Sequence, residues 1–368
     1  MFMKKLILIV LALSSLSGLA AEMKVSTLFF GDYYWNKHSD TAANNGLHGL
    51  ALRRIYLNFD SLLDENHTAK VQLEANQKSP TATTTSCTTA TPPVCTTVSD
   101  SSTMTPFIKQ ANVTRKIGDH NVAVGIVATP AWASVESSWG YRDVEKTPLD
   151  FLGWAGAVDG GVSVKGSFME KMLMYQVLYG NGAKNNQETD KYKEMSGSLG
   201  VAPIKDLLVE LFYDKKDSFK GLTDSNVKQL FVGYKLNGLR AGAQYAAYTL
   251  ETQLAGVATA DKKGTVMSAY AVKELSDSWS ALARYDLVSY KTDASVTANS
   301  LYYLSTQTSA KKFNLIIVGA DYKDGENFHI IPNIERVSYS SLTAAATSAG
   351  TAKPKAEEIV RVTFSFKF

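Results

Sequence analysis

The sequence has 368 residues, with 38 lysines and arginines against 35 aspartates and glutamates and a mean hydropathy of −0.10. This balance excludes the basic stripe of a nucleic-acid-binding protein, and no run of 18 apolar residues occurs that could form a transmembrane helix. A membrane role is then open only to a closed barrel, because only helices and closed barrels satisfy every backbone polar group in lipid.

The chain begins with the features of an export signal. Lys4 and Lys5 precede the short apolar run 6–13, and small residues follow it. This run is too short to span a bilayer, so residues 1–21 are predicted to be a signal peptide. Without the two signal lysines, 36 basic residues remain against 35 acidic ones, and residues 22–368 show no internal linker. They are therefore predicted to form one domain.

Apolar and polar residues alternate in many later segments. In 67–76, for example, Val71 and Leu73 alternate with Lys70 and Gln72. Successive side chains of a strand point to opposite faces, so each segment has one apolar and one wet face. Repeats of this kind predict an all-β, antiparallel, up-and-down transmembrane barrel. About 16 strands are predicted, at 24–35, 49–61, 67–76, 106–117, 121–129, 160–168, 171–180, 193–203, 207–216, 226–236, 239–249, 264–275, 279–290, 312–322, 328–339 and 358–368.

The connections between these segments alternate between short and long. The short ones, such as Asn237-Gly238, carry the Gly, Asn and Asp residues of tight hairpins. This asymmetry predicts short periplasmic turns and long external loops, with both termini on the periplasmic side. The long connections are 36–48, 77–105, 130–159, 181–192, 217–225, 250–263, 291–311 and 340–357.

The only two cysteines, Cys87 and Cys95, lie in the Ser-, Thr- and Pro-rich connection 77–105. In an exported chain, two cysteines so close together predict a disulfide, and two free thiols are the alternative. Closing so short a loop would stabilise the fold by roughly 2–3 kcal/mol, because it constrains the unfolded chain.

The connection 130–159 has an unusual composition. It holds Trp132, Trp139 and Trp154, three of the chain's five tryptophans, together with Tyr141. A loop with so much aromatic surface is expected to fold into the barrel and narrow it; an external loop packed on its neighbours, or a subunit contact, is the alternative. The candidate residues of this pore constriction are Glu136, Arg142, Asp143, Glu145, Lys146 and Asp150.

The last eleven residues give the clearest alternation, with Val360, Val362, Phe364, Phe366 and Phe368 on one face. An alternating strand that ends on phenylalanine resembles the assembly signal of bacterial outer-membrane porins, carried here by Phe364, Phe366 and Phe368. The resemblance implies export through the periplasm to the outer membrane, and assembly into a homotrimer. It also implies barrel assembly machinery, membrane lipid and lipopolysaccharide as partners, and a third external loop that folds inward.

Several loose motifs are similar to the phosphate-selective porin family and its relatives, and they are spread over most of the mature chain. They are the segments Gly125–Pro130, Asp159–Gly166, Tyr179–Gly182 and Gly319–Lys323. Phosphate selectivity itself is not predicted, because such a channel needs an excess of Arg and Lys along its path. By alternation, inward-facing basic and acidic residues are about equal in number. The predicted lumen wall includes Arg54, Lys70, Glu74, Lys165, Glu210, Arg240, Arg284, Asp286 and Arg361.

Signals for an enzyme are poor. The five histidines are scattered without metal-ligand spacing, and no phosphate-binding loop or nucleophile-elbow motif occurs. We therefore predict no catalytic, metal or cofactor site, and a passive water-filled channel for small hydrophilic solutes and ions. One alternative is a surface adhesin or structural barrel with a blocked lumen. The other is an outer-membrane hydrolase whose site is assembled from distant strands.

Overall fold

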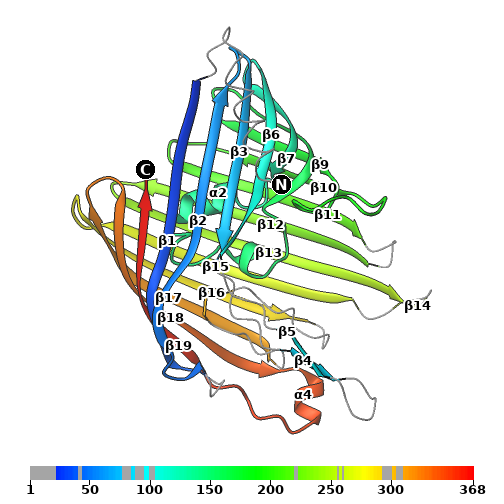
Figure 1. The fold of residues 1–368 in the computed structure, drawn as a ribbon, viewed down its shortest axis with the longest axis vertical. Coiled ribbons are helices and arrows are strands. Elements are labelled where there is room, and N and C mark those ends of the chain that lie inside the picture. Colours follow the sequence, from blue (N-terminus) through cyan, green and yellow to red (C-terminus); the bar gives the residue numbers. More distant parts are fainter. Residues whose placement is uncertain are drawn as a thin grey trace.

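The computed structural model describes residues 22–39, 44–76, 84–87, 95–98, 104–218, 223–254, 257–258, 261–291, 301–303 and 310–368. The predicted signal peptide, residues 1–21, lies outside the described residues. The described strands form one large sheet that closes on itself (Figure 1) and a separate two-stranded hairpin.

The large sheet contains seventeen strands, of which the two-residue β14 (Val257–Ala258) pairs only with β13, so sixteen strands form the ring. The ring strands are β1 (Glu22–His38), β2 (His48–Leu62), β3 (His67–Asn76), β6 (Thr105–Ile117), β7 (His120–Ala128), β8 (Val158–Phe168), β9 (Leu173–Gly180), β10 (Glu194–Val201), β11 (Leu207–Ser218), β12 (Thr223–Leu236), β13 (Leu239–Leu254), β15 (Lys262–Glu274), β16 (Trp279–Tyr290), β17 (Ala310–Asp324), β18 (Phe328–Leu342) and β19 (Glu357–Lys367).

Each ring strand pairs antiparallel with its neighbours along the chain, and β1 pairs with β19 to close the ring. This confirms the predicted up-and-down barrel of about 16 strands, and every predicted strand has its counterpart. The bounds of β3 match the prediction, whereas β11, β12 and β13 run further than predicted. The connections 217–225 and 250–263 are correspondingly shorter than expected.

The short connections and both ends of the described chain gather at one end of the ring, called here the turn end. Glu22 of β1 lies opposite Leu62, and the backbone of Phe368 exchanges two hydrogen bonds with Thr27. The long connections lie at the other end, called here the loop end. The hairpin of β4 (Thr84–Cys87) and β5 (Cys95–Val98) and the helix α4 (Ala344–Ser348) belong to loop-end connections.

The outer face of the ring is apolar, as the alternation predicts. Val71, Leu211, Ile316 and Val362 are among the large apolar side chains exposed on it, at 38–55%. Such a face is expected to lie against lipid. None of the described helices has the length and apolar character that crossing a membrane would need.

Two β-bulges change which side chains reach the interior. The pairing of β1 with β2 skips Arg53, and the pairing of β3 with β6 skips Lys109. A bulge adds one residue to one strand and re-aims the side chains beside it. As a result, Arg53 and Arg54 are both buried, although they are neighbours in sequence.

The core of the protein lies inside the ring, where residues 129–157 cross the lumen between β7 and β8 (Figure 1). Helix α2 (Ala133–Trp139) ends at Gly140, whose φ of 74° gives the left-handed turn that glycine adopts without strain. Helix α3 (Pro148–Phe151) begins with a proline, which needs no hydrogen-bond partner at that position. We call residues 129–157 the lumen loop.

Candidate functional site

The lumen loop divides the interior into two unequal environments. Toward β11–β19 it packs tightly, and the inward side chains of those strands are buried. Toward β3 and β6–β9 the inward side chains are mostly polar and only half-buried. We call these the packed half and the open half; β1 and β2 border both.

In the packed half, aromatic side chains fix the lumen loop against the wall. The ring of Trp139 makes edge-on contacts with Tyr141 and with Tyr270 of β15, with centroids 5.6 and 5.3 Å apart. Trp154 stacks on Tyr248 of β13 at 5.2 Å. Trp139, Tyr141 and Trp154 are only 1–6% exposed.

Buried charged side chains of the wall hold the backbone of the loop. Arg53 donates to the carbonyl oxygen of Asp143 and pairs with Asp32 of β1 at 3.0 Å. Arg284 of β16 donates to the carbonyl oxygen of Lys146 at 2.6 Å and pairs with Asp286. Because each guanidinium meets both a carboxylate and a carbonyl, its charge and several of its donors are satisfied away from water.

A second segment, residues 301–303 between β16 and β17, also reaches into the packed half. The backbone N–H of Tyr302 donates to the Glu145 carboxylate at 3.0 Å, and the Tyr302 ring lies under Arg53 at 4.0 Å. The Tyr303 hydroxyl donates to Asp32 at 2.9 Å. Residues 301–303 therefore contact both the lumen loop and the wall that supports it.

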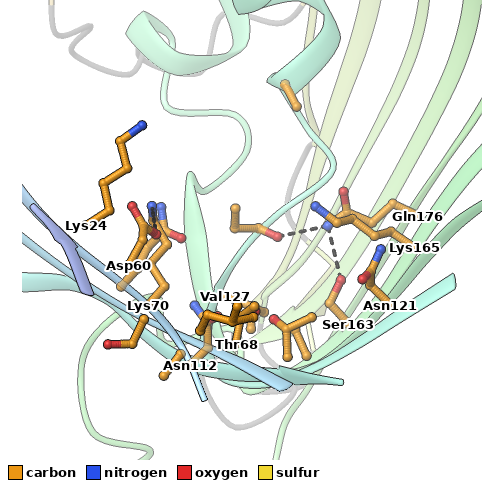
Figure 2. A pocket seen from close by; sticks show the side chains of 18 of the residues that line it. Lys24, Asp60, Thr68, Lys70, Asn112, Asn121, Val127, Ser163, Lys165 and Gln176 are labelled. Carbon is orange, nitrogen blue, oxygen red and sulfur yellow. Dashed lines mark hydrogen bonds and ion pairs between the residues drawn. The ribbon is translucent and has the colours of Figure 1, made fainter. Parts of the chain in front are cut away.

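The open half contains a cavity of about 530 Å³, lined by β1–β3, β6–β9 and the start of the lumen loop (Figure 2). Lys24, Asp60 and Lys70 lie on one side of it, and Lys165 and Gln176 on the other. A neighbouring cavity of about 660 Å³ shares Lys165 and Gln176 and continues toward β10 and β11. This half can therefore hold water and small polar solutes.

Two charge clusters, one on the wall and one on the lumen loop, lie close enough to interact electrostatically. On the wall, the Glu74 carboxylate lies between Arg54 and Lys109, at 3.4 and 3.2 Å. On the lumen loop, Arg142 lies between Glu136 and Asp150, at 3.2 and 2.8 Å. Burial raises the pKa of the Glu136 carboxyl, and the Arg142 charge opposes that rise.

The six candidate constriction residues therefore separate into two groups. The side chains of Glu136, Arg142 and Asp150 are 37, 16 and 14% exposed and form the cluster on the lumen loop. Glu145 and Lys146 are buried by packing, at 0 and 7% exposed. Asp143 lines a cavity of about 780 Å³ at the turn end of the packed half instead, which Arg240 also lines.

The predicted lumen-wall residues all lie on inward positions, but only some border open space. Lys70, Lys165 and Glu210 line cavities in the open half, and Arg240 lines the turn-end cavity of the packed half. Glu210 accepts a hydrogen bond from Ser134 of the lumen loop at 2.6 Å. The buried wall residues are Arg54, Glu74, Glu210, Arg284, Asp286 and Arg361.

Sequence reasoning missed four residues that the structure places in this region: Arg53, Lys109, Tyr302 and Tyr303. The first two are brought inward by bulges, which alternation cannot anticipate. The two tyrosines lie in a long connection without any repeat. The adjacent pair Arg53-Arg54, which breaks the alternation of β2, was the one available signal.

The proposed disulfide stays a prediction. In the β4–β5 hairpin, Cys87 lies directly opposite Cys95 in register. Directly opposed residues of an antiparallel pair have Cα atoms about 4.5–5.5 Å apart, a separation that a disulfide can bridge.

No protein-family model and no curated protein matches the chain in sequence. Solved structures do match its fold. An anion-selective porin from Comamonas acidovorans matches with a TM-score of 0.67 at 14% identity, over 95% of this chain and 100% of the porin. OmpF of Salmonella typhi, solved with daunomycin, matches with a TM-score of 0.60 at 11% identity, over 95 and 98% of the two chains. The trimer form of OmpT, an outer membrane protein of Vibrio cholerae, matches with a TM-score of 0.59 at 11% identity, over 95 and 100%. At these identities the likeness shows the fold, and the chain is a closed 16-stranded barrel of the kind found in bacterial outer-membrane porins.

Proposed function

We propose that the protein is an outer-membrane channel that lets small hydrophilic solutes and ions diffuse passively. The observation that carries this proposal is the open half: polar side chains and cavities of about 530 and 660 Å³ lie inside a ring whose outer face is apolar. A barrel with an apolar belt outside and a wet interior is suited to span a membrane and conduct through its lumen.

The lumen loop is proposed to form the constriction of this channel. Its cluster of Glu136, Arg142 and Asp150 lies near the wall cluster of Arg54, Glu74 and Lys109, and the two interact electrostatically. Solutes that pass between the two clusters would meet fixed charges on both sides, where little water is available to screen them. Glu145, Lys146 and Asp143 are proposed to support the loop rather than to touch solutes.

Several finer features belong to the same proposal. A homotrimer is supported by the fold match to the trimer form of the Vibrio cholerae protein. Membrane lipid, lipopolysaccharide and barrel assembly machinery are proposed partners, with Phe364, Phe366 and Phe368 as the assembly signal. Export through the periplasm with removal of residues 1–21 is proposed as well. A relationship to phosphate-selective porins is also proposed, and it rests only on the loose sequence motifs.

The competing functions make different demands on the lumen. A surface adhesin or structural barrel needs no continuous water path, and a hydrolase needs a nucleophile beside a base. His329 hydrogen-bonds Asp321 at 3.0 Å, but the same carboxylate is held by the Tyr141 hydroxyl, which ties it to the packing of the lumen loop. We therefore retain the channel as the function that the geometry supports best.

Single-channel recording in a planar bilayer tests the proposal. Refolded protein whose heat-modifiable mobility shows a closed barrel is expected to give discrete conductance steps. The same barrel without such steps would contradict the channel and favour a blocked structural barrel. Turnover of ester or peptide substrates by the same preparation would instead favour the hydrolase.

A further inference from the structure

Inward-facing basic and acidic residues are about equal in number over the whole barrel, but they are not evenly distributed between its two halves. In the packed half, the guanidinium groups of Arg53, Arg284 and Arg361 pair with Asp32, Asp286 and Glu335, and all six side chains are at most 6% exposed. These charges are balanced and shielded, so a solute in the open half meets little of their field. The charges that border the open half therefore decide which ions it attracts.

On the wall of the open half, basic groups outnumber acidic groups at two positions along the barrel axis, called here levels. Toward the loop end, Glu74 is only 1% exposed, whereas Arg54 and Lys109, which share it, are 11 and 20% exposed. One carboxylate cannot neutralise two cations, so this cluster presents a net positive charge to the lumen.

The second level lies in the cavity of about 530 Å³. Lys70 pairs with Asp60 at 3.0 Å, and Lys24 lies opposite Asp60 on the neighbouring strand. Lys165 approaches from the far side (Figure 2). Within the described residues, neither Lys24 nor Lys165 forms an ion pair, and both are exposed. Against the three lysines stand Asp60 and Glu22, so this cavity is also net positive.

Between the two levels the wall offers amide donors. Gln72 donates to the Asn58 side-chain oxygen at 2.7 Å, and Gln110 donates to the Gln72 oxygen at 3.2 Å. The oxygens of Asn58 and Gln72 are thus engaged by neighbouring amides, while each amide NH₂ group has two hydrogens. Among the described contacts, Gln72 and Gln110 each keep one N–H that can donate to a passing anion, and their side-chain oxygens keep acceptor capacity as well.

We infer that the open-half wall, from Arg54 and Lys109 past Gln72 and Gln110 to Lys24 and Lys165, is a path for small anions such as chloride or a small carboxylate. This inference rests on the proposed channel function and assigns its solute class. The loop cluster, with two acids against Arg142, confines anions to the wall side. The neighbouring cavity, lined by Lys116, Lys165 and Lys171 against Asp119 and Glu210, is net positive by the same count.

The test is the reversal potential of the full-length refolded barrel in a potassium chloride gradient. Wild type is expected to prefer chloride. The double variant Lys24→Gln/Lys165→Gln is expected to shift the reversal potential toward cations, and Asp60→Asn to shift it further toward anions. Both shifts should shrink between 0.1 and 1 M salt, where the screening length falls from about 10 to about 3 Å.

Lys235→Gln is the matched control. Lys235 lines the turn-end cavities of the packed half and carries the same charge, but it lies off the proposed path. Its loss should leave the reversal potential close to wild type. A shift as large as that of the double variant would overturn the path, because it would show that only the total charge matters.

Replacing chloride by acetate or phosphate identifies the anion. Permeation of acetate assigns small carboxylates as well as inorganic anions, and permeation of chloride alone restricts the path to inorganic ions. Open channels that prefer cations, or show no preference, would overturn the anion path and leave the channel function intact. A closed barrel that never conducts would overturn the proposed function, and with it the path.

Discussion

The two halves of the barrel have the same apolar outer face but very different inner faces. In β3, the inward residues Lys70, Gln72 and Glu74 are all polar, and they border the open half. In β17, the inward residues Leu315 and Ile317 are as apolar as the outward Ile316 between them, and both are fully buried. A strand that is apolar on both faces is covered on both faces. The composition of the inner face therefore reports whether the lumen beside a strand is wet or filled.

The largest expected effect tests this difference between the halves. Arg at position 317 would be buried without a partner, which costs roughly 3–5 kcal/mol or more. Ile317→Arg should therefore prevent refolding, whereas Gln72→Arg at an inward site of the open half should be tolerated. Val71→Arg, on the outer face, should cost roughly 2–4 kcal/mol at the membrane midplane. The fraction of heat-modifiable barrel after refolding measures all three.

Equal refolding of Ile317→Arg and Gln72→Arg would show that the packed half is wet. The proposed difference between the two halves would then be wrong. Equal refolding of Val71→Arg and Gln72→Arg would instead show that the assignment of inner and outer faces in β3 is wrong.

The next effect concerns the lumen loop. Trp139 is 1% exposed, and its indole N–H donates to the Glu145 carbonyl oxygen at 3.1 Å. Trp139→Ala should weaken the packing of the loop by about 3 kcal/mol, because a buried aromatic ring is replaced by a cavity. The strand ladder does not depend on this ring, so the barrel should still fold. Single-channel conductance should rise, because the loop is free to leave the lumen.

Trp279→Ala is the control for that measurement. Trp279 is 44% exposed and contacts Tyr322, its neighbour on β17, with ring centroids 5.0 Å apart. Its loss should leave conductance unchanged. If Trp139→Ala also leaves conductance unchanged, the position of the loop does not set the width of the path.

Much of the fold followed from the alternation of apolar and polar residues. The repeat in residues 67–76 defined β3, and the aromatic residues at every second position up to Phe368 defined the last strand. Alternation assigns one face of each strand to lipid and the other to the lumen, because only one face must suit lipid. The aromatic residues of the lumen loop predicted that it would be buried, since no exposed loop gains from holding so many.

The site was less predictable, because its details depend on pairings between distant segments. Arg53 and Lys109 reach the lumen through bulges, and a bulge shows only when the partner strand is known. Tyr302 and Tyr303 contact the wall from a connection without any pattern. Glu145 looked like a pore charge, yet it is fully buried as the acceptor for the Tyr302 backbone.

A smaller effect is expected from the segment that supports the packed half. Tyr303→Phe removes the hydroxyl that donates to Asp32 at 2.9 Å but keeps the ring that stacks on Tyr34 at 4.2 Å. Asp32 still has Arg53 and Thr363 as partners. The free energy of unfolding in urea should therefore fall by only about 1 kcal/mol.

Tyr245→Phe provides the baseline for that measurement, because Tyr245 is 43% exposed on the outer face. The free energy of unfolding should be nearly the same as in wild type. If Tyr303→Phe loses no more stability than Tyr245→Phe, the hydroxyl contact of residues 301–303 does not stabilise the packed half.

The smallest effect is a pH dependence of ion preference, and it arises at the border between the halves. Glu136 faces Arg142 and Asp150 on the lumen loop, and Arg54 and Lys109 on the wall contribute to its surroundings. Burial raises the pKa of this carboxyl, and a carboxyl with a raised pKa loses its charge at a higher pH than an ordinary glutamate. On acidification, the negative charge of the loop face should therefore begin to disappear above pH about 4.3, the ordinary value for glutamate.

Losing that charge leaves Arg142 with Asp150 alone, so the reversal potential in a salt gradient should move toward anions as the pH falls. At neutral pH, the reversal potential of Glu136→Gln should already lie where that of wild type arrives on acidification. As the pH falls, it should lack the early shift that wild type shows. Glu145→Gln is the matched change in the packed half, where the side chain is fully buried and contacts residues 301–303 instead of the path. Its reversal potential should follow wild type over the same range. If the reversal potentials of the two variants change alike with pH, the charge of Glu136 does not act on ions in the open half. The border between the halves would then contribute nothing to selectivity.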